Sequence, residues 1–293
     1  MADRFDVIEA GQGGRRRWAG LAVLLVVVLV PVIGLIASRE PPPAPPPPPA
    51  PQAIKSLTRA DSPPNLLQVT PRTKGGEQVI AVVFPDGRRA TVRYPAELDL
   101  AGMGVRPYQG MWVDGIFRQL LAPANGEIEI TRGGQPIRSY APNVTLWPQP
   151  AGSGGRGQVL LFAFGKWRLA MYDSQEGLTF DQRLAVARRL RGKVTKAGYL
   201  VLSGGGPVRL ARPGEKVQGA PAGPQLWFGG TARTMVALVP TPGCGKDSAI
   251  PYTITGRGRP AQAVCRGDVQ VAVTGPDSFR RRAIHGIKVT VED

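Results

Sequence analysis

The sequence predicts a single transmembrane helix followed by a β-rich α+β extracytoplasmic region. In that region we expect a mainly antiparallel sheet with one amphipathic helix, and then a small all-β sandwich or barrel-like unit. Three observations lead to this prediction: one long uncharged apolar segment, many short apolar runs, and one segment with helical periodicity. The chain of 293 residues holds 38 glycines and 30 prolines, and this composition favours short elements joined by many turns.

The apolar segment, residues 18–37, reads WAGLAVLLVVVLVPVIGLIA and carries no charge. As a helix rising about 1.5 Å per residue it would span roughly 30 Å, the thickness of a bilayer's hydrocarbon core. Three arginines at residues 15–17 precede it, and such clustered positive charge holds that end in the cytoplasm. We therefore expect a cytoplasmic tail at residues 1–17, a transmembrane helix at 18–38, and the remainder outside the cell membrane.

A cleaved signal peptide is the alternative interpretation of this segment. It would have an apolar core of about 7–15 residues and a small residue three positions before the cut. Leu35 and Ile36 occupy that position for cuts after Ala37 and Ser38. No cysteine follows directly, which excludes a lipoprotein anchor. The length of the run and these two side chains favour a retained anchor.

A proline-rich linker is expected at residues 39–74, disordered or in the polyproline conformation. Its segment 41–51, PPPAPPPPPAP, contains nine prolines. A polyproline II helix rises about 3.1 Å per residue, so this segment would form a rod of roughly 34 Å. The rod would hold the ectodomain away from the bilayer. Docking of an SH3-like or WW-like domain is the alternative role, but such partners are scarce outside a bacterial membrane.

The first extracytoplasmic domain is expected at residues 75–218. Residues 79–94 predict a β-hairpin, because two β-rich runs flank the sequence Phe-Pro-Asp-Gly. Residues 95–104 predict a short helical turn, and residues 158–173 predict two strong strands around Gly165. Further short strands are expected at residues 111–113, 116–121, 127–131, 135–140 and 144–147.

The predicted helix occupies residues 179–192. Thr179 and Gln182 have the spacing of a capping box. Asp181 stands in the first turn and three arginines in the last turn, which favours the helix dipole, and Gly192 would end the helix. The apolar stripe expected to pack on the sheet consists of Phe180, Leu184, Ala187 and Leu190.

The second domain, residues 223–293, shows short runs with Gly and Pro turns, a pattern typical of a small all-β unit. Its core would be marginal, and a single crosslink would stabilise it. We expect Cys244 and Cys265 to form a disulfide, since an oxidising compartment permits one; two unpaired thiols are the alternative. The chain holds one histidine, His285, which does not complete a metal-ligand set.

No catalytic constellation is visible, so we do not expect an enzyme, a cofactor or a metal. A nucleophile needs an adjacent base, and His285 stands beside a glycine at an expected turn. Glu127 with Glu129 on one strand face, and Asp173 with Glu176 in a turn, are pairs that could serve glycoside hydrolysis or bind calcium, although solvated positions are far commoner. The segment GCGKDS lacks the spacing of a phosphate loop.

Charge is the more informative feature. From Gln52 onward there are 32 basic and 17 acidic residues, within a total net charge of +16. A field of this sign attracts anionic lipids or wall polymers, while the location and the lack of interleaved aromatic residues disfavour nucleic acid. A generally basic, solvated surface is the plainer interpretation. The candidate contacts with an anionic surface are Arg188, Arg189, Arg191, Arg280, Arg281 and Arg282.

Together these features indicate a single-pass membrane-anchored protein of the cell envelope, with an Arg-, Gly-, Ala- and Pro-rich composition of high-GC bacterial type. Its basic β-rich ectodomain would bind or scaffold, with the lipid bilayer as partner through residues 18–37. A transmembrane signalling or regulatory protein is the first alternative, although the cytoplasmic tail is too short for a domain. An envelope enzyme acting on wall polymers is the second alternative, and it would require a cleft with converging polar groups.

Overall fold

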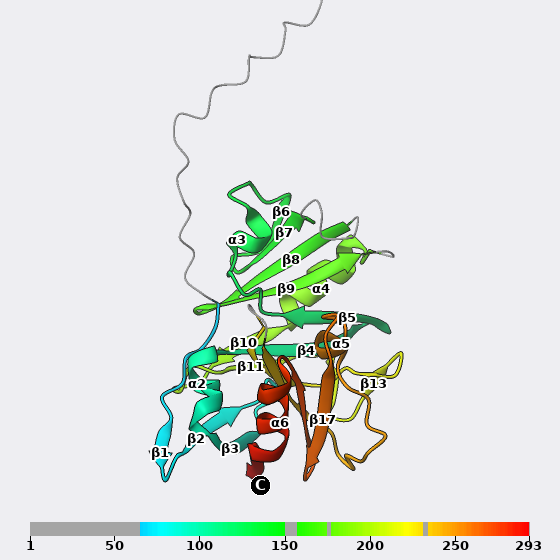
Figure 1. The fold of residues 1–293 in the computed structure, drawn as a ribbon. Coiled ribbons are helices and arrows are strands. Elements are labelled where there is room, and N and C mark those ends of the chain that lie inside the picture. Colours follow the sequence, from blue (N-terminus) through cyan, green and yellow to red (C-terminus); the bar gives the residue numbers. More distant parts are fainter. Residues whose placement is uncertain (1–64, 150–156, 175–176, 231–233, 293) are drawn as a thin grey trace, which may run out of the picture. The chain divides into compact units, whose positions relative to one another are not determined.

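A computed structural model describes residues 65–149, 157–174, 177–230 and 234–292 (Figure 1). The expected transmembrane helix and the polyproline segment lie outside the described residues, so both stay predictions. Within these four ranges, no helix combines the length and the apolar character needed to cross a membrane. The described residues all fall within one compact unit.

The described residues of this unit include nineteen strands. Their bounds are β1 Arg72–Lys74, β2 Glu77–Val83, β3 Arg89–Pro95, β4 Val105–Val113, β5 Ile116–Leu121, β6 Arg138–Ala141, β7 Val144–Pro148, β8 Gly157–Phe164, β9 Trp167–Ser174, β10 Arg191–Val194, β11 Leu200–Ser203, β12 Val208–Leu210, β13 Lys216–Val217, β14 Ala220–Pro221, β15 Gln225–Gly229, β16 Met235–Pro240, β17 Ala261–Arg266, β18 Val269–Thr274 and β19 Lys288–Glu292. The helices are short: η1 Ala96–Leu98, α2 Leu100–Met103, α3 Ile128–Thr131, α4 Phe180–Arg189, α5 Tyr252–Thr255 and α6 Asp277–Gly286.

The pairing is antiparallel throughout the described residues, and this confirms the prediction of a mainly antiparallel, β-rich fold with few helices. One sheet has the order β1-β2-β3-β19. The larger sheet of eleven strands has the order β17-β18-β16-β15-β4-β5-β9-β8-β7-β6, with β12 paired to β4. Two-strand pairs β10-β11 and β13-β14 complete the arrangement. Figure 1 shows the long strands β8 and β9 side by side, as predicted for residues 158–173.

The predicted hairpin at residues 79–94 is confirmed as β2 and β3. Val83 lies opposite Arg89, and the Phe84 N–H donates to the Arg88 carbonyl at 2.8 Å. Gly87 has a φ of +91°, a conformation that side chains with a Cβ rarely adopt. Phe84 itself is fully buried, so the turn also anchors the hairpin in the core.

Residues 65–74 correct the expected end of the linker, because they belong to the fold. The side-chain amide of Asn65 donates to the carbonyls of Pro123 and Arg168, at 2.9 and 2.7 Å. Leu67 is 6% exposed and forms a β-bridge with Val105. The polar composition of this segment suggested disorder. The hydrogen-bond partners of Asn65 and Leu67 lie far along the chain, so the local sequence does not reveal that these polar groups are paired.

The C-terminal part, residues 223–293, shares its sheets with the N-terminal part. Strand β15 pairs with β4, and β19 pairs with β3. The part is also not all-β, because it contains α6 and the one-turn helix α5. The sequence signal for α6 was weak because its buried face includes an arginine, Arg280, beside the small Ala283.

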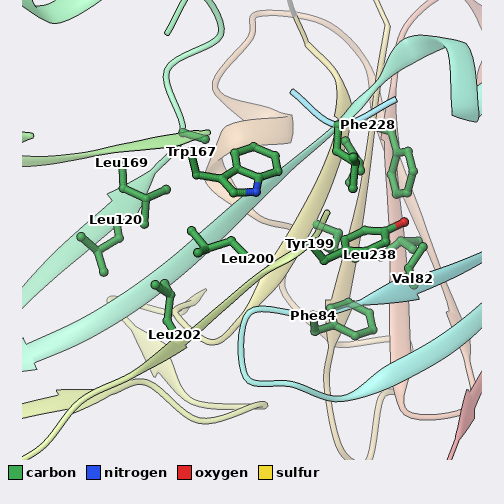
Figure 2. Close-up of a cluster of buried hydrophobic side chains, with 14 of the residues drawn as sticks. Val82, Phe84, Leu120, Trp167, Leu169, Tyr199, Leu200, Leu202, Phe228 and Leu238 are labelled. Carbon is green, nitrogen blue, oxygen red and sulfur yellow. The ribbon is translucent and has the colours of Figure 1, made fainter. Parts of the chain in front are cut away.

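One core joins the two parts of the chain. Figure 2 shows Val82, Phe84, Leu120, Trp167, Leu169, Tyr199, Leu200, Leu202, Phe228 and Leu238 packed together. These side chains come from or adjoin β2, β5, β9, β11, β15 and β16. The Tyr199 hydroxyl donates to the Ala81 carbonyl at 3.1 Å, and burial raises the pKa of this phenol. Phe162, Phe164 and Trp167 are also buried and supply large apolar area to this core.

The capping box of the predicted helix is confirmed at α4. The Gln182 N–H donates to the Thr179 hydroxyl, and the Thr179 N–H donates to the Gln182 side chain. The helix ends at Arg189 rather than at Gly192, because Leu190 turns into extended backbone and is 2% exposed in the core. Arg191 therefore begins β10 instead of standing in the last helical turn.

The apolar stripe of α4 needs one correction. Ala187 and Leu190 are buried as expected, and Leu184 is half-buried, but Phe180 is 48% exposed. The Phe180 ring contacts the Tyr140 ring at 5.5 Å, so it lies at the rim of the sheet rather than under it. Val186, which the stripe omitted, is fully buried in its place.

Candidate functional site

A concentration of exposed positive charge lies where α4 passes into β10. Arg188 and Arg189 end the helix, Arg191 and Lys193 follow in the strand, and Lys196 stands in the next turn. Because alternate residues of a strand point to opposite faces, Arg191 and Lys193 share the outer face. We call these five exposed residues the basic strip.

The charge of the basic strip is not neutralised within the described part of the chain. None of its members forms an ion pair with a described carboxylate, and Arg191 contacts the Leu190 carbonyl at 3.3 Å. The carboxylates that do form ion pairs hold other cations: Glu77, Asp86, Glu127, Asp173, Glu215 and Asp277. Neighbouring unpaired cations produce a local positive potential that attracts anionic ligands.

The three arginines at residues 280–282 do not form one exposed, unpaired surface. Arg280 is 8% exposed, and its guanidinium donates to the Asp277 carboxylate at 2.9 Å and to the carbonyl of Pro260. Arg281 is exposed but pairs with the same Asp277 at 2.7 Å. Only Arg282 is both exposed and without an ion pair among the described residues. Arg280 is thus a structural residue, because a helix turns three consecutive side chains in different directions.

The structure places Asp173 in a buried ion-pair cluster and not in an exposed turn. We expected a turn carboxylate paired with Glu176, which lies outside the described residues. The Asp173 carboxylate is fully buried and binds Arg118 at 3.0 Å and Arg183 at 2.7 Å. It also accepts the Leu178 N–H at 2.9 Å. These contacts join β5, β9 and α4, so the cluster fixes the position of the helix that carries the basic strip.

Glu127 and Glu129 do not share a strand face, because residues 128–131 form α3. Arg168 binds Glu127 at 2.7 Å, whereas Glu129 accepts the Asn125 N–H at 3.2 Å. Glu127 belongs to the wall of a shallow pocket of about 320 Å³, and Glu129 does not. The residues that line this pocket are Glu127, Thr131, Gly133, Gly134, Pro142, Asn143, Thr145, Trp147, Leu161, Ala163 and Arg168. The arrangement does not bring two carboxylates across one cavity.

His285 lies on α6, where its Nδ1 is 2.7 Å from the Arg281 carbonyl oxygen, and the side chain is exposed. The structure therefore places it within a helix rather than at a turn. Within the described ranges there is no group of three or more His, Cys, Asp or Glu side chains with the geometry to hold a metal ion.

The disulfide between Cys244 and Cys265 is confirmed, with the two Cα atoms 5.7 Å apart. It ties the loop after β16 to strand β17, and a pocket of about 320 Å³ lies beside it. Gln270 is 2% exposed; its Nε2 donates to the Ser248 carbonyl at 3.0 Å, while its Oε1 has no partner among the described residues. The lining consists of Gly245, Lys246, Ser248, Ala263, Val264, Cys265 and Gln270.

Sequence reasoning missed a polar network around Glu215. Its carboxylate accepts two bonds from Arg209, at 2.7 and 2.9 Å, one from the Trp112 indole at 2.8 Å, and one from the Arg212 N–H at 2.9 Å. The hydrogen bonds from Arg209, with those from Arg212 and Trp112, lower the pKa of Glu215 to about 2. No local sequence signal reveals this network, since Trp112 and Glu215 are 103 positions apart.

Comparisons with protein-family models, curated proteins and solved structures found no match to this chain. The geometry and charge of the chain's own residues therefore indicate what it can bind. Two features have the character of binding sites: the basic strip, which carries unneutralised charge, and the disulfide-lined pocket, which contains an unsatisfied acceptor.

Proposed function

We propose that this protein is a single-pass, membrane-anchored binding protein of a bacterial cell envelope. Its ectodomain attaches to an anionic partner, either an anionic lipid surface or a wall polymer, through the basic strip. The observation that supports this function is the run of exposed cations from Arg188 to Lys196, none of which has a carboxylate partner among the described residues. The protein holds the captured partner near its own membrane and changes no bond in it.

The anchor and linker expected from the sequence supply the geometry of this proposal. A helix at residues 18–37 keeps the chain in the bilayer, and the proline segment 41–51 sets the ectodomain roughly 34 Å away. That distance exceeds the Debye length of about 8 Å at physiological salt, so the ectodomain acts on partners that come within direct reach of its cations.

Three described carboxylates that could have served catalysis form ion pairs with arginines. Asp173 and Glu127 are held by arginines at 2.7 Å, and Glu215 is held by Arg209 at the same distance. A general base must be within reach of a substrate proton and have a pKa near the working pH. These paired carboxylates favour a binding role over an enzymatic one.

The test uses the full chain held in nanodiscs of neutral lipid. Binding of fluorescent vesicles containing phosphatidylglycerol, and of a labelled anionic wall polymer, is measured at low and at physiological salt. The test variant is Lys193→Glu combined with Arg189→Glu. The matched control is Lys216→Glu, an exposed lysine of β13 outside the strip.

We expect the double variant to bind at least about 30-fold more weakly, because each cation near an anionic surface contributes about 1 kcal/mol. The Lys216→Glu control should change binding by less than about threefold. Binding that is independent of salt, or equal loss in the control, would contradict the role of the basic strip.

A further inference from the structure

Strand β17 is a terminal strand of the large sheet, paired on one side with β18. The two strands are joined by a two-residue turn, so Arg266 and Val269 face each other as a hydrogen-bonded pair. Opposite residues in an antiparallel pair alternate between bonded and non-bonded positions. Ala261, Ala263 and Cys265 therefore direct their backbone N–H and C=O groups away from β18.

This outer edge has no strand partner within the described residues. No other described residue hydrogen-bonds to the backbone of Ala261 or Ala263 on that side, and the Cys265 carbonyl has one long contact, 3.4 Å, with the Arg266 guanidinium. Such a row of unpaired donors and acceptors is a template for another strand. The edge is also free of proline, which would remove its donors.

The disulfide-lined pocket adjoins the same edge. Three consecutive residues of β17, Ala263 to Cys265, line it together with the loop residues Gly245, Lys246 and Ser248. At about 30 Å³ per water, the pocket's volume of about 320 Å³ holds on the order of ten waters or one to two side chains. Gln270 lines the pocket, and its Oε1 is buried without a partner among the described residues. A hydroxyl or amide donor that reached this atom would satisfy it.

The charged residues near the pocket indicate which class of partner would bind. Lys246 carries the one charge in the pocket lining, and its exposed side chain has no ion pair among the described residues. Two exposed arginines, Arg257 and Arg259, stand just before the strand. The adjacent Asp247 is also exposed but does not line the pocket, so a ligand carboxylate within the pocket mouth would be attracted by Lys246.

We propose that the outer edge of β17 and the adjoining pocket bind an extended acidic peptide, which adds as a strand to the sheet. Its backbone pairs with Ala261, Ala263 and Cys265, one hydroxyl- or amide-bearing side chain enters the pocket toward Gln270, and a carboxylate two residues away meets Lys246. Strand addition of this kind takes affinity from main-chain hydrogen bonds and specificity from pockets for alternate side chains. The site is separate from the basic strip and goes beyond the function proposed above.

Two other occupants fit the edge less well. A second copy of this chain would bring together two molecules that each carry a net charge of +16. The chain's own segment 41–51 consists of nine prolines and two alanines, and proline has no N–H to donate to the edge.

The experiment measures hydrogen–deuterium exchange of the full chain in neutral nanodiscs. The probe is a library of acetylated heptapeptides with threonine at the third position, glutamate at the fifth and mixed residues elsewhere. The control library carries lysine in place of glutamate. We expect the glutamate library to slow exchange of the outward amides of Ala261, Ala263 and Cys265 by at least about tenfold, because these three amides have no partner among the described residues. The lysine library should slow it by less than about threefold.

The test variants address the backbone and the charge separately. Ala263→Pro removes an outward N–H without breaking a bond to β18, and should abolish the protection. Lys246→Glu, at an exposed position, should weaken the glutamate library at least about tenfold while Lys216→Glu leaves it unchanged. If Ala263→Pro fails to fold, the Lys246→Glu result decides the proposal alone.

Three results would overturn the proposal. One is unchanged exchange at residues 261–265 with millimolar library. Another is protection confined to the basic strip, which would indicate non-specific attraction of acidic peptides. The third is protection that appears without peptide and rises with protein concentration, which would assign the edge to a second copy. None of these results bears on polymer binding by the basic strip, which the Arg189 and Lys193 variants test.

Discussion

The disulfide makes a quantitative prediction about stability. Replacing both Cys244 and Cys265 by serine opens a crosslink between residues 21 positions apart. In the chain-entropy model, closing a loop of this length stabilises the folded state by about 3.3 kcal/mol. For a folded unit of this size, a loss of 1 kcal/mol lowers Tm by about 2–4 °C, so we expect a decrease of roughly 7–13 °C.

The assay is thermal unfolding of the full chain in detergent, followed by circular dichroism with and without a thiol reductant. The oxidised natural chain should melt highest, and the reduced chain should melt with the double-serine variant. The reductant should have no effect on that variant, which serves as the internal control. A difference in Tm below about 2 °C, or an equal effect of reductant on the variant, would refute the reasoning that the crosslink stabilises this fold.

Two further predictions concern buried and partly buried carboxylates. Asp173→Asn removes the buried carboxylate charge that binds Arg118 and Arg183 and should destabilise the fold by about 3–5 kcal/mol, measured by urea unfolding. Asp181→Asn, an exposed change in the first turn of α4, should alter stability by less than about 1 kcal/mol, and comparable losses would contradict the role of the buried cluster. In the folded protein the pKa of Glu215 is lowered to about 2. Its ion pair is partly exposed and should stabilise the fold by about 1 kcal/mol. This stabilisation is present above the unfolded pKa of 4.5 and is lost as the pH falls toward 2. The Tm difference between the natural chain and Glu215→Gln should therefore be full at pH 6 and vanish near pH 2, and a difference independent of pH would exclude this ionisation.

The arginines predicted to contact an anionic surface differ in how well the sequence predicted their exposure. The sequence indicated Arg188, Arg189 and Arg191, and the structure exposes all three. It equally indicated Arg280, which the structure buries against Asp277 and two backbone carbonyls. A guanidinium is buried when acceptors converge on it, and the Pro260 carbonyl that helps to do so lies 20 positions away. The distribution of charged residues along the sequence therefore does not predict which arginine is buried.

The peptide-binding edge depends still more on tertiary structure. The sequence predicted a run at residues 261–265 and a disulfide at its end, but a strand becomes an edge only through the order of the whole sheet. Gln270, whose Oε1 has no partner among the described residues, is polar in a mainly apolar strand. That isolated polar residue was a signal available in the sequence, and its meaning required the pocket beside it.

The sequence by itself determined the elements whose signals act over a few residues. The hairpin turn at Gly87, the capping box at Thr179 and the pairing of Cys244 with Cys265 were all predicted, because backbone conformation, a capping hydrogen bond and a short covalent loop are local matters. Tertiary structure alone decided that β15 pairs with β4, that β19 pairs with β3, and that the described chain shares one main core. Those pairings join strands more than a hundred residues apart, and any β-rich run offers the same backbone donors and acceptors. Which run becomes the partner is therefore set by the burial of the whole core and not by the run itself.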